Sequence, residues 1–221
     1  PKQPSETSLP ETGGDDVLAA LYEQADWLLS QGEFLSAAQL GEHILALADE
    51  PVSLARVLAY RILGYSRMFQ GDFPGARQHL ENALAAYHAL GRPDTLPWIG
   101  GDLELVCRTA LGFTLAVYGY LDQAWAHISQ ALARARRIKH KSTLGSTLIL
   151  ACEVAVLRGD MDALRALAGE LLRVGETEGL QFFLAHGWAA AGYAQATQTR
   201  PGTPQAAANL DLIRRGMRLW E

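Results

Sequence analysis

A glycine followed two positions later by a bulky apolar residue recurs four times along the chain. The glycines are Gly32, Gly71, Gly119 and Gly159, and the intervals between them are 39, 48 and 40 residues. Self-similarity at a period of about 20–50 residues is typical of stacked-repeat proteins. In such proteins one unit cannot bury its apolar face alone, so each unit packs on its neighbours. This pattern therefore predicts an elongated repeat array.

Residues at fixed offsets from each glycine are small or apolar. Seven residues before it stand Ala25, Gly64, Gly112 and Cys152; five after it stand Ala37, Ala76, Ala124 and Leu164; twelve after it stand Ile44, Ala83, Ala131 and Leu171. Small residues let two helices approach closely, and a glycine can adopt the left-handed conformation that ends a helix. The repeating unit is therefore predicted to be a pair of antiparallel helices.

Five such pairs are predicted. In chain order they are Asp16–Gln31 with Glu33–Ala48, Val52–Gln70 with Asp72–Leu90, Asp102–Tyr118 with Leu121–Ile138, Ser142–Arg158 with Met161–Glu176, and Leu180–Thr197 with Pro204–Trp220. An insertion at Gly91–Gly101 contains two prolines and three glycines, which exclude a helix and explain the 48-residue interval. Residues 1–15 are polar, so we expect a flexible linker or tag remnant there and a single repeat domain over 16–221.

Composition agrees with an all-α chain. Ala and Leu number 35 each, whereas Val and Ile, which favour strands, number 15 together. The net charge of −5 gives no electrostatic reason to expect nucleic acid or an anionic membrane as a partner. No apolar stretch reaches the ~20 residues of a membrane span. The two cysteines cannot make a disulfide framework, so a cytoplasmic location is expected.

The second pair shows most fully which family the pattern resembles. Its aromatic, Leu-Gly, Gly-Asp-aromatic and alanine positions are similar to those of the tetratricopeptide repeat (TPR): Tyr60, Leu63-Gly64, Gly71-Asp72-Phe73, Ala76 and Ala83-Leu84. The fourth pair departs from the family, with Cys152 and Leu164 where small residues are usual. The resemblance implies an all-α, right-handed α-solenoid of about five antiparallel helix pairs.

Residues 31–198 also resemble the C-terminal repeat region of bacterial multidomain signal-transduction regulators. The most specific likenesses are Gly119-Tyr120-Leu121-Asp122-Gln123-Ala124 and His186-Gly187-Trp188. In those regulators an ATPase module, often with an adenylate-cyclase or LuxR-type output domain, precedes the repeats. The resemblance implies that this chain is the repeat region of a larger regulator, whose catalytic residues lie elsewhere.

No catalytic motif is present in the chain. There is no phosphate-binding glycine loop, no nucleophile elbow and no metalloprotease helix, so we do not expect an enzyme or a cofactor. The six histidines are scattered without ligand spacing, so no metal site is expected. Cys107 and Cys152 are predicted to pack in the core. The basic run 134–141 either contacts phosphate or an acidic partner, or is a solvated helix end that favours the helix dipole.

In TPR arrays the first helix of each pair lines a concave groove, so the resemblance implies binding positions on those helices. The candidates are Arg61, Tyr65, Arg67, Trp98, Arg108, Glu153 and His186. Arginine and aromatic side chains supply a large share of interface energy. The alternative is that Tyr65 packs on the next repeat and the arginines are only solvated. Trp98, in the insertion, is either a lid over the groove or a plug on the core.

The leading hypothesis is a non-catalytic module that binds a protein or peptide partner. The alternative is a sensor domain whose groove binds a small effector or a signalling peptide and controls an upstream ATPase or output domain. Self-association into a homo-oligomer through the terminal repeats is a further possibility.

Overall fold

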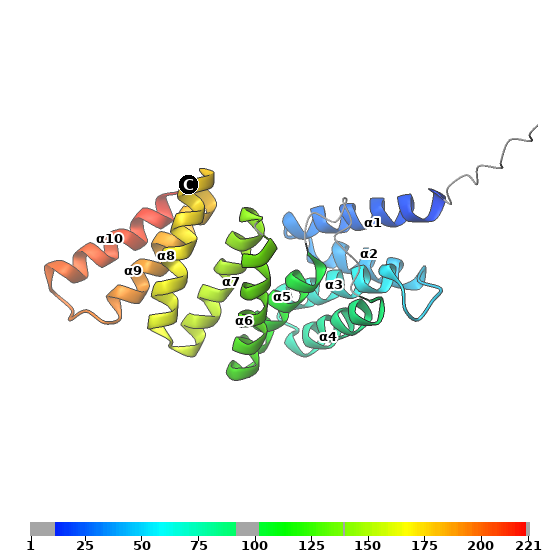
Figure 1. The fold of residues 1–221 in the computed structure, drawn as a ribbon, viewed down its shortest axis with the longest axis horizontal. Helices are drawn as coiled ribbons and strands as arrows, with labels where there is room; N and C mark the ends of the chain where they lie inside the picture. Colours follow the sequence, from blue (N-terminus) through cyan, green and yellow to red (C-terminus); the bar gives the residue numbers. More distant parts are fainter. Residues whose placement is uncertain (1–11, 92–101, 139, 220–221) are drawn as a thin grey trace, which may run out of the picture.

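The computed structural model describes residues 12–91, 102–138 and 140–219, and within these ranges the chain forms ten α-helices and no strand. The helices are α1 (Thr12–Ser30), α2 (Phe34–Ala46), α3 (Leu54–Phe69), α4 (Phe73–Ala89), α5 (Leu103–Val117), α6 (Leu121–Ile138), α7 (Lys141–Arg158), α8 (Met161–Glu178), α9 (Gln181–Ala196) and α10 (Pro204–Arg218). They form an elongated array with α1 near one end and α10 at the other (Figure 1). The all-α fold of five helix pairs is therefore confirmed.

The start of the first helix corrects one predicted boundary. Helix α1 begins at Thr12, four residues before the predicted start at Asp16, so the predicted boundary between linker and repeat domain lies inside a helix. The segment 12–16 contains two glycines and two aspartates, which are weak helix formers, and this composition led to the later predicted helix start. The rest of the predicted linker lies outside the described residues, as does the candidate Trp98.

The helices divide into an inner and an outer layer. We call α1, α3, α5, α7 and α9 the A helices and the other five the B helices. Each helix packs on the next in the chain, and every A helix also contacts the A helix of the neighbouring pair. In the described part of the chain, by contrast, B helices do not contact one another. The array is therefore curved, with the A helices closer together on its inner face.

The repeat glycines end the A helices as predicted. Their φ values of +80°, +81°, +96° and +70° lie in the left-handed region, which a residue without Cβ adopts at little cost. In two repeats an aspartate follows and begins the B helix. Asp72 accepts a hydrogen bond from Gly75 N and Asp160 accepts one from Ala163 N, each at 3.0 Å. These caps satisfy backbone donors that have no partner within the helix.

The small residues lie where two helices of one pair approach. A Cβ placed on Gly64 would be 2.6 Å from Leu80 Cγ, and one on Gly112 would be 2.8 Å from Ile128 Cγ1. The residues predicted five and twelve positions after each glycine are all fully buried: Ala37, Ala76, Ala124, Leu164, Ile44, Ala83, Ala131 and Leu171. The offsets in the sequence therefore correspond to the A–B interface of each pair.

The two cysteines belong to the core, as predicted. Cys107 of α5 and Cys152 of α7 are buried in the larger hydrophobic cluster, which extends from α3 to α9. Burial raises the pKa of both thiols to about 12, so neither forms the thiolate required of a nucleophile at neutral pH.

Candidate binding groove

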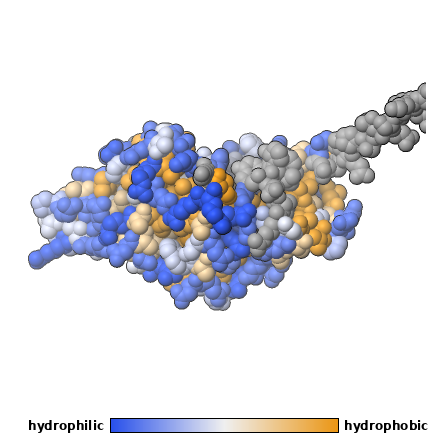
Figure 2. All heavy atoms as spheres, in the orientation of Figure 1, coloured by the Kyte–Doolittle hydropathy of each residue, from blue (hydrophilic) through white to orange (hydrophobic). Residues whose placement is uncertain are grey.

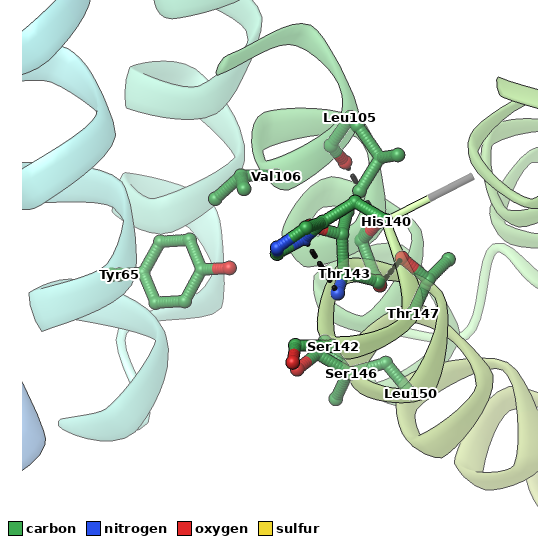
Figure 3. Close-up of a pocket in the computed structure, with 10 residues that line it drawn as sticks. Tyr65, Leu105, Val106, His140, Ser142, Thr143, Ser146, Thr147 and Leu150 are labelled. Atoms are coloured by element: carbon green, nitrogen blue, oxygen red, sulfur yellow. Dashed lines mark hydrogen bonds between the residues drawn. The ribbon is translucent and has the colours of Figure 1, made fainter. Parts of the chain in front are cut away.

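A cavity of about 210 Å³ lies on the A-helix face between α3, α5 and α7. We call it the α5–α7 cavity, and it is lined by Tyr65, Leu105, Val106, Thr109, His140, Ser142, Thr143, Ser146, Thr147 and Leu150. All ten residues come from A helices or from the residue that begins one. Figure 3 shows the Tyr65 side chain on one side and the start of α7 on the other, with the His140 ring pointing toward the Tyr65 hydroxyl.

The first turns of α7 supply most of the polar groups of this cavity. Ser142, Thr143, Ser146 and Thr147 are spaced so that they share one face of the helix. The Thr147 hydroxyl donates to the Thr143 carbonyl at 2.8 Å, so its lone pairs remain able to accept. Leu105, Val106 and Leu150 supply the apolar part of the lining. The cavity thus combines an apolar floor with several hydroxyl groups.

His140 begins α7 and fixes its own ring orientation. The Nδ1 atom accepts a hydrogen bond from Thr143 N at 3.4 Å and lies 2.7 Å from Thr143 Oγ1. Because Nδ1 accepts, the neutral ring carries its proton on Nε2. His140 therefore offers a hydrogen-bond donor at the edge of the α5–α7 cavity.

A second cavity, of about 240 Å³, lies between α7 and α9. We call it the α7–α9 cavity, and it is lined by Ile149, Cys152, Glu153, Val156, His186, Ala189, Ala190 and Tyr193. The structure thus brings together two of the predicted groove residues, Glu153 and His186, which are 33 positions apart in the sequence. The His186 ring also packs on Phe182, with ring centroids 4.5 Å apart.

Arg61 is mostly buried and is not the exposed groove residue that we expected. Its side chain is 11% exposed, and its Nη1 lies 2.6 Å from Asp26 Oδ1. The guanidinium lies over the rings of Tyr22 and Tyr65, 5.2 Å from each centroid. Burial raises the pKa of Tyr65 to about 12, so its phenol stays neutral. Arg61 therefore holds Tyr65 in place at the wall of the α5–α7 cavity.

Two further candidates lie away from the cavities of the A-helix face. Arg67 is 3.9 Å from carboxylate oxygens of both Glu42 and Asp72, at the end of α3. Arg108 donates from Nε and Nη2 to Glu104 Oε1, at 3.0 and 2.8 Å, and lines a different cavity between α5 and α6. Of the six described candidates, Tyr65, Glu153 and His186 line cavities on the A-helix face.

Sequence reasoning missed the hydroxyl-bearing face of α7. A signal was present, because two Ser/Thr pairs four residues apart lie on one side of any helix. That signal identifies a polar helix face, but it does not say that Tyr65, 77 positions before Ser142, lies opposite. No three His, Cys, Asp or Glu side chains in the described part of the chain are grouped so that they could hold a metal ion. None of the described helices combines the length and apolar character that a membrane span needs.

Comparison with known proteins supports the fold at low sequence identity. No protein-family model matches the chain, and no curated protein matches its sequence. The structure is similar to BtubC (BKLC) from P. vanneervenii, with a TM-score of 0.72 and 18% identity, over 94% of this chain and 84% of that one. It is also similar to a putative kinesin light chain with TPR-like repeats from Podosopora anserina, with a TM-score of 0.65 and 13% identity, over 92% and 96% of the two chains.

A third similar structure is a Rap protein complexed with Competence and Sporulation Factor. The TM-score is 0.68 and the identity 12%, over 90% of this chain and 54% of that one. Together the helix order, the left-handed glycines and these likenesses define a TPR-like α-solenoid. The resemblance inferred from the repeat motif is thus confirmed at the level of the fold.

Proposed function

We propose that this chain is a non-catalytic interaction module that binds a protein or peptide segment on its A-helix face. The observation behind the proposal is the pair of cavities on either side of α7, each lined by side chains of A helices or by the residue that begins one. Binding sites are concave and largely apolar, with a few polar groups that fix orientation. Both cavities fit that description.

The two cavities suit a segment with two apolar side chains. One side chain contacts Leu105 and Leu150 in the α5–α7 cavity, and the other contacts Val156 and the Tyr193 ring in the α7–α9 cavity. The α7 hydroxyls and the His140 Nε2–H pair with the polar main chain of the segment, so that its amides are not buried without partners. Glu153 and His186 at the second cavity would favour a polar or basic group beside the second apolar side chain.

The proposed setting is a larger bacterial signalling or transcriptional regulator in the cytoplasm. The support is the resemblance of residues 31–198 to the repeat regions of such regulators, together with the likeness to a Rap protein that binds Competence and Sporulation Factor. In that setting the module recruits a partner protein, and we infer no contact with nucleic acid or membrane through this domain. A second copy of the chain is the alternative partner.

Selection of binding peptides tests the proposal. A phage-displayed library of random linear peptides is selected on the protein, and enriched peptides are measured by fluorescence anisotropy. Ser146→Trp places an indole into the α5–α7 cavity from an exposed position of α7, and Ser129→Trp is the matched control at an exposed position of the B helix α6. We expect the first variant to weaken peptide binding at least about tenfold, as for the loss of a buried contact residue, and the control to leave it unchanged.

Two results would contradict the proposal. One is that no peptide is enriched above background. The other is that the enriched peptides bind both variants equally, since binding would then lie elsewhere on the surface. Light scattering of the free protein tests the self-association alternative, which requires a mass that grows with concentration.

A small effector is the second candidate ligand for the same face. The observation that favours it is the density of hydrogen-bonding groups in the α5–α7 cavity, where α7 supplies four Ser/Thr residues and His140 stands at its start. A thermal-shift screen of metabolites, repeated on Ser146→Trp, separates the two candidates. Stabilisation by a metabolite that is lost in this variant supports the sensor, whereas a response only to peptides supports the interaction module.

A further inference from the structure

A third cavity, of about 220 Å³, lies between α5 and α6 and belongs to neither groove cavity. We call it the arginine cavity, and it is lined by Glu104, Arg108, Gln130, Arg134 and Arg137. Arg134 also lies 3.5 Å from the Tyr87 hydroxyl, so the cavity is beside the end of α4. Its lining contains three guanidinium groups and one carboxylate, and therefore carries an excess of positive charge.

Two of the arginines are held in fixed orientations by buried carboxylates. Arg134 Nε donates to Asp102 Oδ2 at 2.7 Å, and its Nη1 lies 3.1 Å from Glu104 Oε2. Arg108 donates to the other oxygen of Glu104. The side chains of Asp102 and Glu104 are only 5% and 6% exposed. Since these bonds use only part of the N–H groups, each guanidinium keeps donors for a further acceptor.

Glu104 remains ionised in this arrangement. Burial alone opposes ionisation, but hydrogen bonds from Arg108 and His88 and the charge of Arg134 hold the pKa of the Glu104 carboxyl below its ordinary value. The Glu104 carboxylate therefore orients the arginines at neutral pH. Together with Asp102, which pairs with Arg134, it offsets two of the three positive charges around the cavity and leaves one in excess.

Arg137 supplies a positive charge with no acidic partner. Its side chain is exposed at the end of α6, and in the described part of the chain no carboxylate lies within ion-pair distance of it. Gln130, two turns earlier on α6, adds amide donors on the same side of the cavity. The helix spacing of Gln130, Arg134 and Arg137 places all three on the face that lines it.

We propose that the arginine cavity binds a phosphate group, either free or as the monoester of a small molecule. A planar carboxylate is satisfied by one guanidinium through two parallel bonds. Here three guanidinium groups from two helices, α5 and α6, line one cavity, which suits a tetrahedral anion with several oxygens. Two of them are oriented before the ligand arrives, so little side-chain entropy is lost on binding.

The basic run at the end of α6 contains its own control. Arg136 is the neighbour of Arg137, but it lies on a different face of the helix and pairs with Glu170, at 3.1 and 2.6 Å. It does not line the cavity. Replacing either arginine by glutamine removes one charge from the same turn of the same helix, so any effect of total charge is equal in the two variants.

The test uses inorganic phosphate as the probe, titrated against sodium chloride at equal ionic strength. Binding is followed by amide chemical shifts in α5 and α6 and by the midpoint of thermal unfolding. We expect saturable shifts with phosphate, a dissociation constant raised at least about tenfold in Arg137→Gln, and less than about a twofold change in Arg136→Gln. Circular dichroism in chloride checks that both variants are folded.

Further arms of the titration define the ligand. Glycerol phosphate that binds at least as tightly as inorganic phosphate identifies a monoester ligand, whereas binding of phosphate alone identifies the free ion; either result supports the proposal. Acetate that binds as tightly as phosphate overturns the phosphate assignment. The whole proposal is overturned if chloride reproduces the shifts, or if the two glutamine variants respond alike.

Discussion

Substitution of Gly64 by alanine tests whether the small residues of the repeat set the helix separation. The new Cβ would lie 2.6 Å from Leu80 Cγ and 3.4 Å from Leu80 N. Carbon atoms in contact are normally ~3.5–4.0 Å apart, so α3 and α4 must separate by about 1 Å. Leu80 is fully buried, so it cannot move out into solvent without disturbing its neighbours. Overpacking costs about 1–3 kcal/mol, and we expect about 2–3 kcal/mol here, because the new Cβ would lie 2.6 and 2.7 Å from two Leu80 side-chain carbons.

Helix propensity acts in the opposite direction. Alanine is favoured over glycine in a helix interior by about 1 kcal/mol. The net expectation for Gly64→Ala is therefore a loss of about 1–2 kcal/mol in the free energy of unfolding. For a chain of this length that lowers the midpoint of thermal unfolding by about 2–8 °C. Hydrogen exchange is expected to place the increased opening in α3 and α4.

Gly169 provides the matched control within α8. A Cβ there meets nothing closer than Arg173 Nη1 at 3.9 Å, so alanine brings only the gain in propensity. We expect Gly169→Ala to raise the unfolding midpoint by about 2–4 °C. The reasoning is refuted if Gly64→Ala is as stable as the unchanged protein, or if both substitutions shift the midpoint in the same direction.

Three further predictions follow from buried groups. Burial raises the pKa of Cys107 and Cys152 to about 12, so neither thiol should react with a thiol reagent at pH 8 until the protein unfolds. Rapid labelling of the native protein would contradict their positions in the core. Burial lowers the pKa of His79 and His127, so below about pH 6.5 the unfolded chain binds more protons than the folded one, and the free energy of unfolding should fall on acidification. Replacing both histidines by glutamine should flatten this part of the plot of stability against pH. An unchanged plot would exclude the two histidines as the cause. Glu104→Gln should lower the free energy of unfolding, measured with denaturant, by about 3 kcal/mol, because Arg108 and Arg134 lose a buried ionic partner. An unchanged midpoint of denaturant unfolding would show that these ion pairs do not stabilise the fold.

The repeat architecture was predictable because it depends on local rules. Within each of the first four helix pairs, the glycine ends the A helix and the small residues at fixed offsets lie where the A and B helices approach. The spacing in the sequence was therefore enough to locate the A–B interfaces. The first helix start was missed because Gly13, Gly14 and the following aspartates argue against a helix locally.

The groove was predictable only in part. Glu153 and His186 were selected as exposed A-helix positions, and the superhelix places them at one cavity. Arg61 was selected by the same rule, but the sequence does not show that Asp26 and two tyrosines enclose it. The basic run was treated as one cluster, whereas the helical turn directs Arg137 to a cavity and Arg136 to Glu170. These outcomes depend on which residues of other helices lie opposite, and a single sequence does not give that information.

The position of α7 between two cavities has a mechanical consequence. The same helix is a wall of both, since Leu150 faces the α5–α7 cavity and Ile149 faces the α7–α9 cavity. A tilt of α7 that widens one space narrows the other, because α5 and α9 bound them from the outside. A ligand that widened one cavity would therefore narrow the other. If the chain binds its ligand as proposed, a long segment that fills both cavities would hold α7 in its central position, whereas a small molecule in one cavity would tilt α7 and shift the later repeats relative to the earlier ones.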